Sequence, residues 1–191
     1  MWPWEHLAFA YLLYSLFAHA VYRRSPDGAA AFLVALGSQA PDLVDKPLSW
    51  TFSLTPTGHG VMHSILIMGP LLAGALLLTN GRNRRLVAAY TIAHLSHLVG
   101  DLIYEPLLLN EPLIVGRVLW PVVSLPAYST DQGGLIGRAA VYFFRWIHHL
   151  ATQGLTPLVV FELSLVFGVI ALWVYDGAPV LADLVRYARS D

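Results

Sequence analysis

The sequence predicts an all-α integral membrane protein, a helical bundle of about five transmembrane segments with one interfacial amphipathic helix. Hydrophobic residues make up 57% of the chain and charged residues 12%, whereas soluble domains average about 45–50% and 25%. The mean hydropathy of +0.60 agrees with this reading. Apolar stretches close to the roughly 20 residues of a membrane crossing recur along the chain. We expect a single membrane domain over residues 1–191.

Five apolar stretches carry the predicted crossings. They cover residues 6–22, 29–40, 61–79, 86–104 and 155–175. The second is too short for an upright span, so a tilted crossing competes with a half-helix buried by its neighbours. We expect a crossing there.

The segment between the last two stretches is broken by prolines and glycines. Within it, residues 138–150 alternate aromatic and basic side chains, which predicts an amphipathic helix at the membrane interface. The expected organisation is a metal-site core over about residues 1–125, an interfacial segment over about 126–154, and a last transmembrane helix over about 155–175.

Basic residues predict the orientation. Seven arginines follow the first, third and fifth stretches: Arg23, Arg24, Arg82, Arg84, Arg85, Arg186 and Arg189. The other cations are Lys46, Arg117, Arg138 and Arg145. Because cytoplasmic loops are enriched in Lys and Arg, five crossings place the amino terminus outside. We expect a multi-pass protein of the cell membrane.

Composition restricts the chemistry. The chain has no cysteine, which excludes disulfides and thiolate metal sites, so a metal must be held by His, Asp or Glu. A net charge of −1 gives no basic field for nucleic acid. The chain holds eight histidines, several of them within apolar runs, and ionisable groups at membrane depth are functional candidates.

Ionisable residues form four short clusters: His6; Asp42 and Asp45; His59 and His63; and His94, His97 and Asp101. His97 and Asp101 are four residues apart and share a helix face, which His94 joins from three residues earlier. Asp42 and Asp45 follow Pro41, a position that suits the first turn of a helix. With the amino terminus outside, all four clusters fall at the outer membrane face.

Imidazole and carboxylate ligands together favour Zn²⁺, with Mn²⁺ or Fe²⁺ as alternatives. One or two ions would activate a water, and two bridged ions suit phosphoryl ester hydrolysis. Other readings stay open for single residues. His97 and Asp101 could form an interhelical hydrogen bond, and Asp42 could cap a helix. Glu162 could pair with an arginine, support a ligand or carry protons.

Three further histidines have simpler interpretations. We expect His19 to be a buried structural residue, and His148 and His149 to lie at the membrane surface.

These residues resemble a known family, the membrane-bound metal-dependent hydrolases called YdjM-like (DUF457). The matching pieces, over about residues 2–125, are His6, Pro41-Asp42-x-x-Asp45, His63-Ser64, His97-x-x-x-Asp101 and Leu119-Trp120-Pro121. The amino-acid sequences of residues 1–7 and 41–47 are similar to those of haloarchaeal members. The resemblance implies a helical membrane hydrolase with divalent metal ligands His6, Asp42, Asp45, His63, His97 and Asp101.

The chain departs from the family pattern at two places. The family's histidine and arginine before His63 fall on Gly58 and His59. A role for His59 as ligand therefore stays open, and a cation for an anionic substrate is lost, for which Arg117 is a candidate replacement. The Asp-x-x-Asp spacing differs from the commoner Asp-x-Asp, so either carboxylate could bind.

The sequence thus predicts a metal-dependent hydrolase at the outer membrane interface. The expected substrate is a phospholipid or another membrane-associated phosphoester, attacked by a metal-activated water with Asp45 or His94 as general base. The alternatives are a metal-ion or proton transporter and a non-catalytic subunit stabilised by metal. The expected partner is membrane lipid, with no nucleic acid, and the oligomeric state is left open.

Overall fold

A computed structural model describes residues 1–123, 125–127 and 133–189 of the chain. Within these ranges the protein is helical and contains no strand, which confirms the all-α prediction. The helices are α1 (Pro3–Phe17), α2 (Gly28–Trp50), α3 (Ile65–Leu78), α4 (Gly81–Leu108), α5 (Gly134–Gln153), α6 (Pro157–Tyr175) and α7 (Leu181–Ala188). A π-helical turn, Ala18–Tyr22, continues α1, and a 3-10 turn covers Val115–Val118.

Eight residues lie outside the described ranges. They are residue 124 of the metal-site core, residues 128–132 of the interfacial segment, and the last two residues of the chain.

Two helices, α4 and α6, are long and apolar enough to cross a membrane. They contain 28 and 19 residues. The apolar helix α3 has 14 residues and is therefore about 21 Å long, which is shorter than the roughly 30 Å hydrocarbon core of a bilayer. The bundle of five transmembrane segments therefore stays a prediction. Among the described helices, α4 and α6 have the length and composition that a membrane crossing requires.

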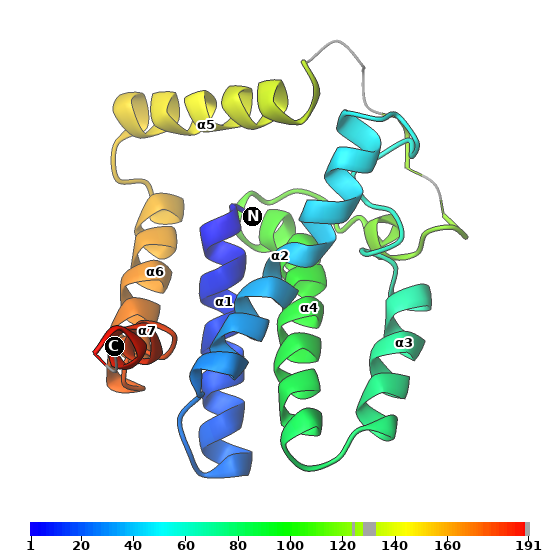
Figure 1. Cartoon of the computed structure of the whole chain (residues 1–191). Coiled ribbons are helices and arrows are strands. Elements are labelled where there is room, and N and C mark those ends of the chain that lie inside the picture. Colours follow the sequence, from blue (N-terminus) through cyan, green and yellow to red (C-terminus); the bar gives the residue numbers. More distant parts are fainter. Residues whose placement is uncertain (124, 128–132, 190–191) are drawn as a thin grey trace.

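Helix directions alternate through the bundle (Figure 1). The helices α1, α3 and α6 run one way, and α2 and α4 run the other way. Helix α5, which covers the predicted interfacial stretch, lies across the end of the bundle where α1 begins. The α1–α2 and α3–α4 connections lie at the opposite end. Arg23 and Arg24 lie in the first of these connections, and Arg82, Arg84 and Arg85 lie in the first turns of α4, next to the second.

Helix starts are set by capping residues. Side-chain oxygens of Asp27, Ser64 and Thr156 accept backbone N–H groups in the first turns of α2, α3 and α6, at 2.9, 3.3 and 3.3 Å. Such caps satisfy donors that a helix leaves without a partner. Pro3 occupies the first turn of α1, where its missing N–H carries no cost. At α2, α3 and α6 a short polar residue thus fixes where the helix begins.

Helix α2 continues through Pro41 and Pro47 and ends at Trp50. A half-helix that ends near residue 40 is therefore wrong. The expected place of Asp42 and Asp45 in a helix first turn is also wrong, because both lie beyond the middle of α2. A proline inside a helix removes one hydrogen bond, and packing of α2 along α4 compensates for this loss.

Gly37 allows α2 and α4 to approach closely. A Cβ atom at Gly37 would lie 2.6 Å from the carbonyl oxygen of Tyr90 and 3.0 Å from the Cβ of Ala93. Small residues at helix contacts let backbones come together in membrane proteins, and Ala30, Ala31, Ala89 and Ala93 fill the adjoining core. This contact brings the second half of α2 beside the ionisable residues of α4.

A buried carboxylate just after α6 holds this helix against α1. Asp176 accepts hydrogen bonds from the hydroxyls of Tyr11 at 2.9 Å and Ser15 at 2.7 Å. Its other oxygen lies 2.7 Å from His19 Nε2. His19 thus has a hydrogen-bond partner, but its side chain is 34% exposed, so the expected burial is wrong.

Candidate metal centre

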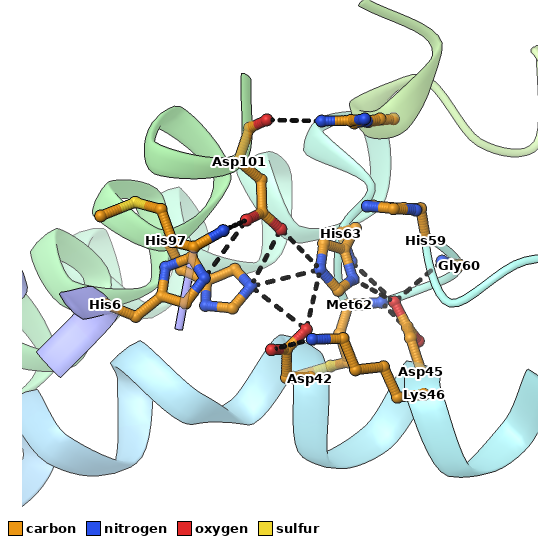
Figure 2. Close-up of polar contacts among 12 residues, drawn as sticks. His6, Asp42, Asp45, Lys46, His59, Gly60, Met62, His63, His97 and Asp101 are labelled. Carbon is orange, nitrogen blue, oxygen red and sulfur yellow. Dashed lines mark hydrogen bonds and ion pairs between the residues drawn. The ribbon is translucent and has the colours of Figure 1, made fainter. Parts of the chain in front are cut away.

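Four ionisable side chains from three parts of the chain meet at one point (Figure 2). They are Asp42 on α2, His63 in the loop before α3, and His97 and Asp101 on α4. Each offers one ligand atom, and these atoms all lie within 4.8 Å of one another. The imidazoles are buried, whereas the carboxylates of Asp42 and Asp101 remain 10% and 13% exposed.

Five of the six separations among these atoms are close to those of a four-coordinate ion. The Nε2 atoms of His63 and His97 lie 3.2 Å apart, and both lie 3.6 Å from Asp42 Oδ1. Asp101 Oδ2 lies 3.5 Å and 3.4 Å from the same two nitrogens. A tetrahedral zinc site with bonds of about 2.0–2.1 Å has ligand–ligand separations of about 3.3–3.4 Å. This group of side chains can therefore hold a metal ion.

Hydrogen bonds to the outer ring nitrogens orient both imidazoles. His63 Nδ1 lies 2.8 Å from Asp45 Oδ2, and His97 Nδ1 lies 2.7 Å from the carbonyl oxygen of Ser38. Because these oxygens only accept, each Nδ1 carries the hydrogen. In the neutral rings, both Nε2 lone pairs then face each other at 3.2 Å, an arrangement that a shared cation would stabilise. Metal-binding histidines ordinarily have such outer partners.

One carboxylate oxygen provides an independent test of the fit. Asp42 Oδ1 is buried and has no hydrogen-bond partner, although buried polar atoms nearly always have one. The other oxygen of this carboxylate contacts Lys46 Nζ. Since Oδ1 faces the Nε2 atoms of His63 and His97, its surroundings suit a cation ligand.

Asp45 lies outside the four-residue group, although the sequence suggested it as a ligand and as a general base. Its Oδ2 accepts the backbone N–H groups of Gly60 and His63, each at 2.9 Å, besides the imidazole Nδ1–H. Its Oδ1 accepts the N–H of Met62 at 3.2 Å. The carboxylate of Asp45 therefore fixes the loop that carries His63.

His6 and His94 also lie next to the centre and outside the group of four. The His6 ring stacks on His97 with a centroid separation of 3.8 Å, and its Nε2 lies 3.2 Å from Asp101 Oδ1. The Nε2 of His94, a predicted general base, lies 2.9 Å from the carbonyl oxygen of Met62. This nitrogen must donate to the carbonyl, so it is not available there as a base.

His59 and His63 lie in a loop of turns, so the helical alignment considered for them is not formed. Burial and the nearby His63 lower the pKa of His59 to about 3. Burial also lowers the pKa of His63, but its hydrogen bonds to Asp101, Asp42 and Asp45 outweigh this effect and raise the value to about 10. In the absence of a metal, a proton on His63 therefore offsets part of the carboxylate charge.

Two basic side chains lie beside the centre, besides the amino-terminal ammonium at 3.7 Å from Asp101 Oδ1. Lys46 pairs with Asp42, and Arg117 donates to the carbonyl oxygen of Asp101 at 2.9 Å and to Glu105 at 2.5 Å. Sequence reasoning suggested Arg117 and missed Lys46, although its spacing of four residues from Asp42 on one helix face was a usable signal. The carbonyl of Ser38, which accepts from His97, could not be predicted in this way, because every residue has a backbone carbonyl.

Glu162 lies in a different buried contact. Its carboxylate accepts hydrogen bonds from Tyr104 at 2.5 Å and from Trp146 at 3.3 Å. The pairing with an arginine that the sequence suggested stays a prediction. A role in supporting a ligand or in carrying protons stays a prediction.

The apolar helices and the buried His and Asp side chains define a helical membrane protein with a candidate metal centre. Residues 1–178 match the family described as YdjM inner membrane protein. The chain belongs to this family, which confirms the resemblance seen in the sequence motifs. No curated protein and no solved structure matches the chain significantly.

Proposed function

We propose that this protein is a membrane-embedded, metal-dependent hydrolase of phosphoester bonds in a lipid or membrane-associated substrate. The observation that carries the proposal is the convergence of two oriented Nε2 atoms with two carboxylate oxygens. This set of two nitrogen and two oxygen donors suits Zn²⁺ best, with Mn²⁺ or Fe²⁺ as alternatives. We propose a single ion, because the described residues form one such group.

The chain's own residues have distinct roles in this proposal. A bound divalent cation would supply a Lewis acid that activates water and polarises a phosphoryl oxygen. With four protein ligands in place, the water would have to enter as a fifth ligand. Asp45 and the Ser38 carbonyl keep Nε2 of His63 and His97 directed inward. Asp101 Oδ1, at 3.2 Å from His6 Nε2, replaces Asp45 and His94 as our proposed proton acceptor, since it adjoins the ligand atom of the same carboxylate.

The surroundings of the centre support an anionic, membrane-associated substrate. Lys46 and Arg117 bring positive charge next to Asp42 and Asp101, and arginine or lysine commonly stabilises a phosphoryl group during transfer. The loop that carries His63 exposes Phe52 and Leu54 by 63% and 72%. Such exposed apolar side chains suit contact with the acyl region of a lipid.

The experiment that tests the proposal combines metal analysis with turnover. The protein is purified without chelators and supplied with zinc or manganese, and its metal content and hydrolysis of phospholipid vesicles and soluble phosphomonoesters are measured. We expect one bound ion and metal-dependent hydrolysis in the wild type. His97→Ala should lose both, whereas His148→Ala, a substitution of an exposed residue on α5, should retain both.

The outcomes separate the alternatives. Stoichiometric metal without turnover of any phosphoester would contradict the hydrolase and favour a metal-stabilised subunit. Metal flux into proteoliposomes that His97→Ala abolishes would instead favour a transporter. A wild-type protein that binds neither metal would overturn the centre itself.

A further inference from the structure

A second site lies at the other end of the bundle, away from the metal centre. A cavity of about 560 Å³ opens between the end of α1, the end of α3 and the first turns of α4. Its volume is in the range of small-molecule sites. Arg85, which lines it, and Asp101 are 16 residues apart on α4 (101 − 85 = 16), a distance of about 24 Å along a helix. The cavity is therefore separate from the centre described above.

The cavity has an apolar part and a cationic part. Phe17, Val21, Leu76 and Ile92 supply apolar side chains, and Arg84 and Arg85 supply positive charge. No acidic residue is among the described residues that line it. The nearby Asp27 pairs with Arg24 at 3.3 Å. The lining therefore suits a ligand with an anionic head and an apolar body.

Two buried polar groups in this cavity lack partners. The hydroxyl of Thr91, in a residue that is 7% exposed, makes no hydrogen bond. The Nε atom of Arg85 is likewise buried without an acceptor. Leaving a buried donor unsatisfied is costly, and a guanidinium presents its donors in a geometry that matches phosphate oxygens. An acceptor inside the cavity would therefore satisfy both groups.

We propose that this cavity binds an anionic phospholipid, with its phosphate on Arg85 and Thr91 and an acyl chain along the apolar side chains of α3. Basic pockets between membrane helices on the cytoplasmic side bind anionic head groups in this way. The arginine-containing end of the bundle is the end expected to face the cytoplasm. Leu77 and Leu78, which are 78% and 86% exposed at the end of α3, would continue the acyl contact outside the cavity.

Native mass spectrometry of the detergent-solubilised protein with added phosphatidylglycerol or phosphatidylcholine tests this proposal. We expect one phosphatidylglycerol per chain and weaker retention of phosphatidylcholine. Arg85→Gln should weaken retention of phosphatidylglycerol by about tenfold or more, because a charge-assisted hydrogen bond is lost. Arg82→Gln removes the same charge from an exposed residue outside the cavity and should bind like the wild type.

A second pair of variants leaves the charge unchanged. Leu76→Trp fills the apolar part and should displace the lipid, whereas Leu71→Trp, at an exposed position of α3 outside the cavity, should not. Equal loss in Arg82→Gln and Arg85→Gln would show general surface electrostatics and overturn the proposal. Glycerol phosphate binding as tightly as the lipid would also overturn it, because the apolar part would then contribute nothing.

Thermal unfolding of each variant shows whether the protein is folded. Because the metal centre is remote, Arg85→Gln and Leu76→Trp should keep the wild-type metal stoichiometry. The lipid proposal can therefore fail without affecting the metal-centre proposal. The metal-centre proposal can likewise fail without affecting the lipid proposal.

Discussion

At the scale of single residues, the contact between Asp45 and His63 determines whether the centre is ready for a cation. Asp45 accepts the Nδ1–H of His63 and three backbone N–H groups around it. One carboxylate therefore folds the loop and also selects the tautomer that exposes Nε2. Outer partners of this kind commonly change metal affinity when they are replaced.

Replacement of this carboxylate by an amide should weaken metal binding without removing a ligand. We expect Asp45→Asn to lower the affinity for Zn²⁺ by about 10- to 100-fold, because the amide can present its NH₂ group to His63 or to the loop. Competition with a coloured chelator measures the change. Asp183→Asn, on an exposed carboxylate of α7, is the matched control. An affinity equal to the wild type would show that Asp45 does not orient His63.

Metal binding should also depend on pH through His63. Its pKa of about 10 in the metal-free protein means that the ring is protonated at neutral pH. This proton must leave before Nε2 can bind a cation, so metal affinity should fall as the pH falls, by about tenfold per pH unit for one displaced proton. Affinities at pH 6 and pH 8, corrected for protonation of the chelator, test this. Equal affinities would indicate an Nε2 that is already free of its proton.

The sequence predicted the four residues at the centre, but it did not predict the role of each neighbouring residue. The spacing of His97 and Asp101 places both on one helix face, and the structure brings them together with Asp42 and His63. The choice between Asp42 and Asp45 was not predictable, because it depends on a loop that folds back onto α2. Backbone partners such as the Ser38 carbonyl cannot be predicted from the pattern of side chains either.

At the scale of elements, the close contact of α2 and α4 sets the distance between the ligands. Gly37→Ala would place a Cβ atom 2.6 Å from the carbonyl oxygen of Tyr90, so the helices must separate. We expect a lower Tm and a lower metal occupancy, because Asp42 moves away from His97. Thermal unfolding and metal analysis of the purified variant provide the measurements.

A second glycine supplies the control. A Cβ atom at Gly74 in α3 would meet nothing within 4 Å, so Gly74→Ala should be neutral or stabilise the helix by about 0.5–1 kcal/mol. If Gly37→Ala unfolded at the same temperature as Gly74→Ala, the contact between α2 and α4 would not limit the stability of the bundle.

Apolar runs and capping residues predicted the existence of the helices but not all of their lengths. The expected stretch 29–40 becomes a helix that reaches Trp50, since contacts with α4 compensate for the hydrogen bonds lost at Pro41 and Pro47. The expected stretch 61–79 becomes a helix that begins at Ile65, because the residues before Ser64 form turns around Asp45. In both cases tertiary contacts outweigh the local signal.

At the scale of the whole molecule, alternation of helix directions predicts which loops share a membrane face (Figure 1). Because the chain has no cysteine, single cysteines can be introduced without background labelling. We expect Glu111→Cys, in the exposed loop after α4 at the metal-centre end, to react in intact cells with a membrane-impermeant maleimide. Asn83→Cys, at the arginine-containing end, should react only after the membrane is opened. The opposite pattern would place the metal centre at the cytoplasmic face.

The set of four donor atoms also has an optical consequence. Cobalt(II) in a tetrahedral field absorbs visible light much more strongly than in an octahedral one, and two imidazoles with two carboxylates favour the tetrahedral case. Cobalt-loaded protein should therefore be visibly blue. Access of an extra water or of a phosphate analogue would change the colour, so the spectrum would follow the coordination of the ion without an enzymatic assay.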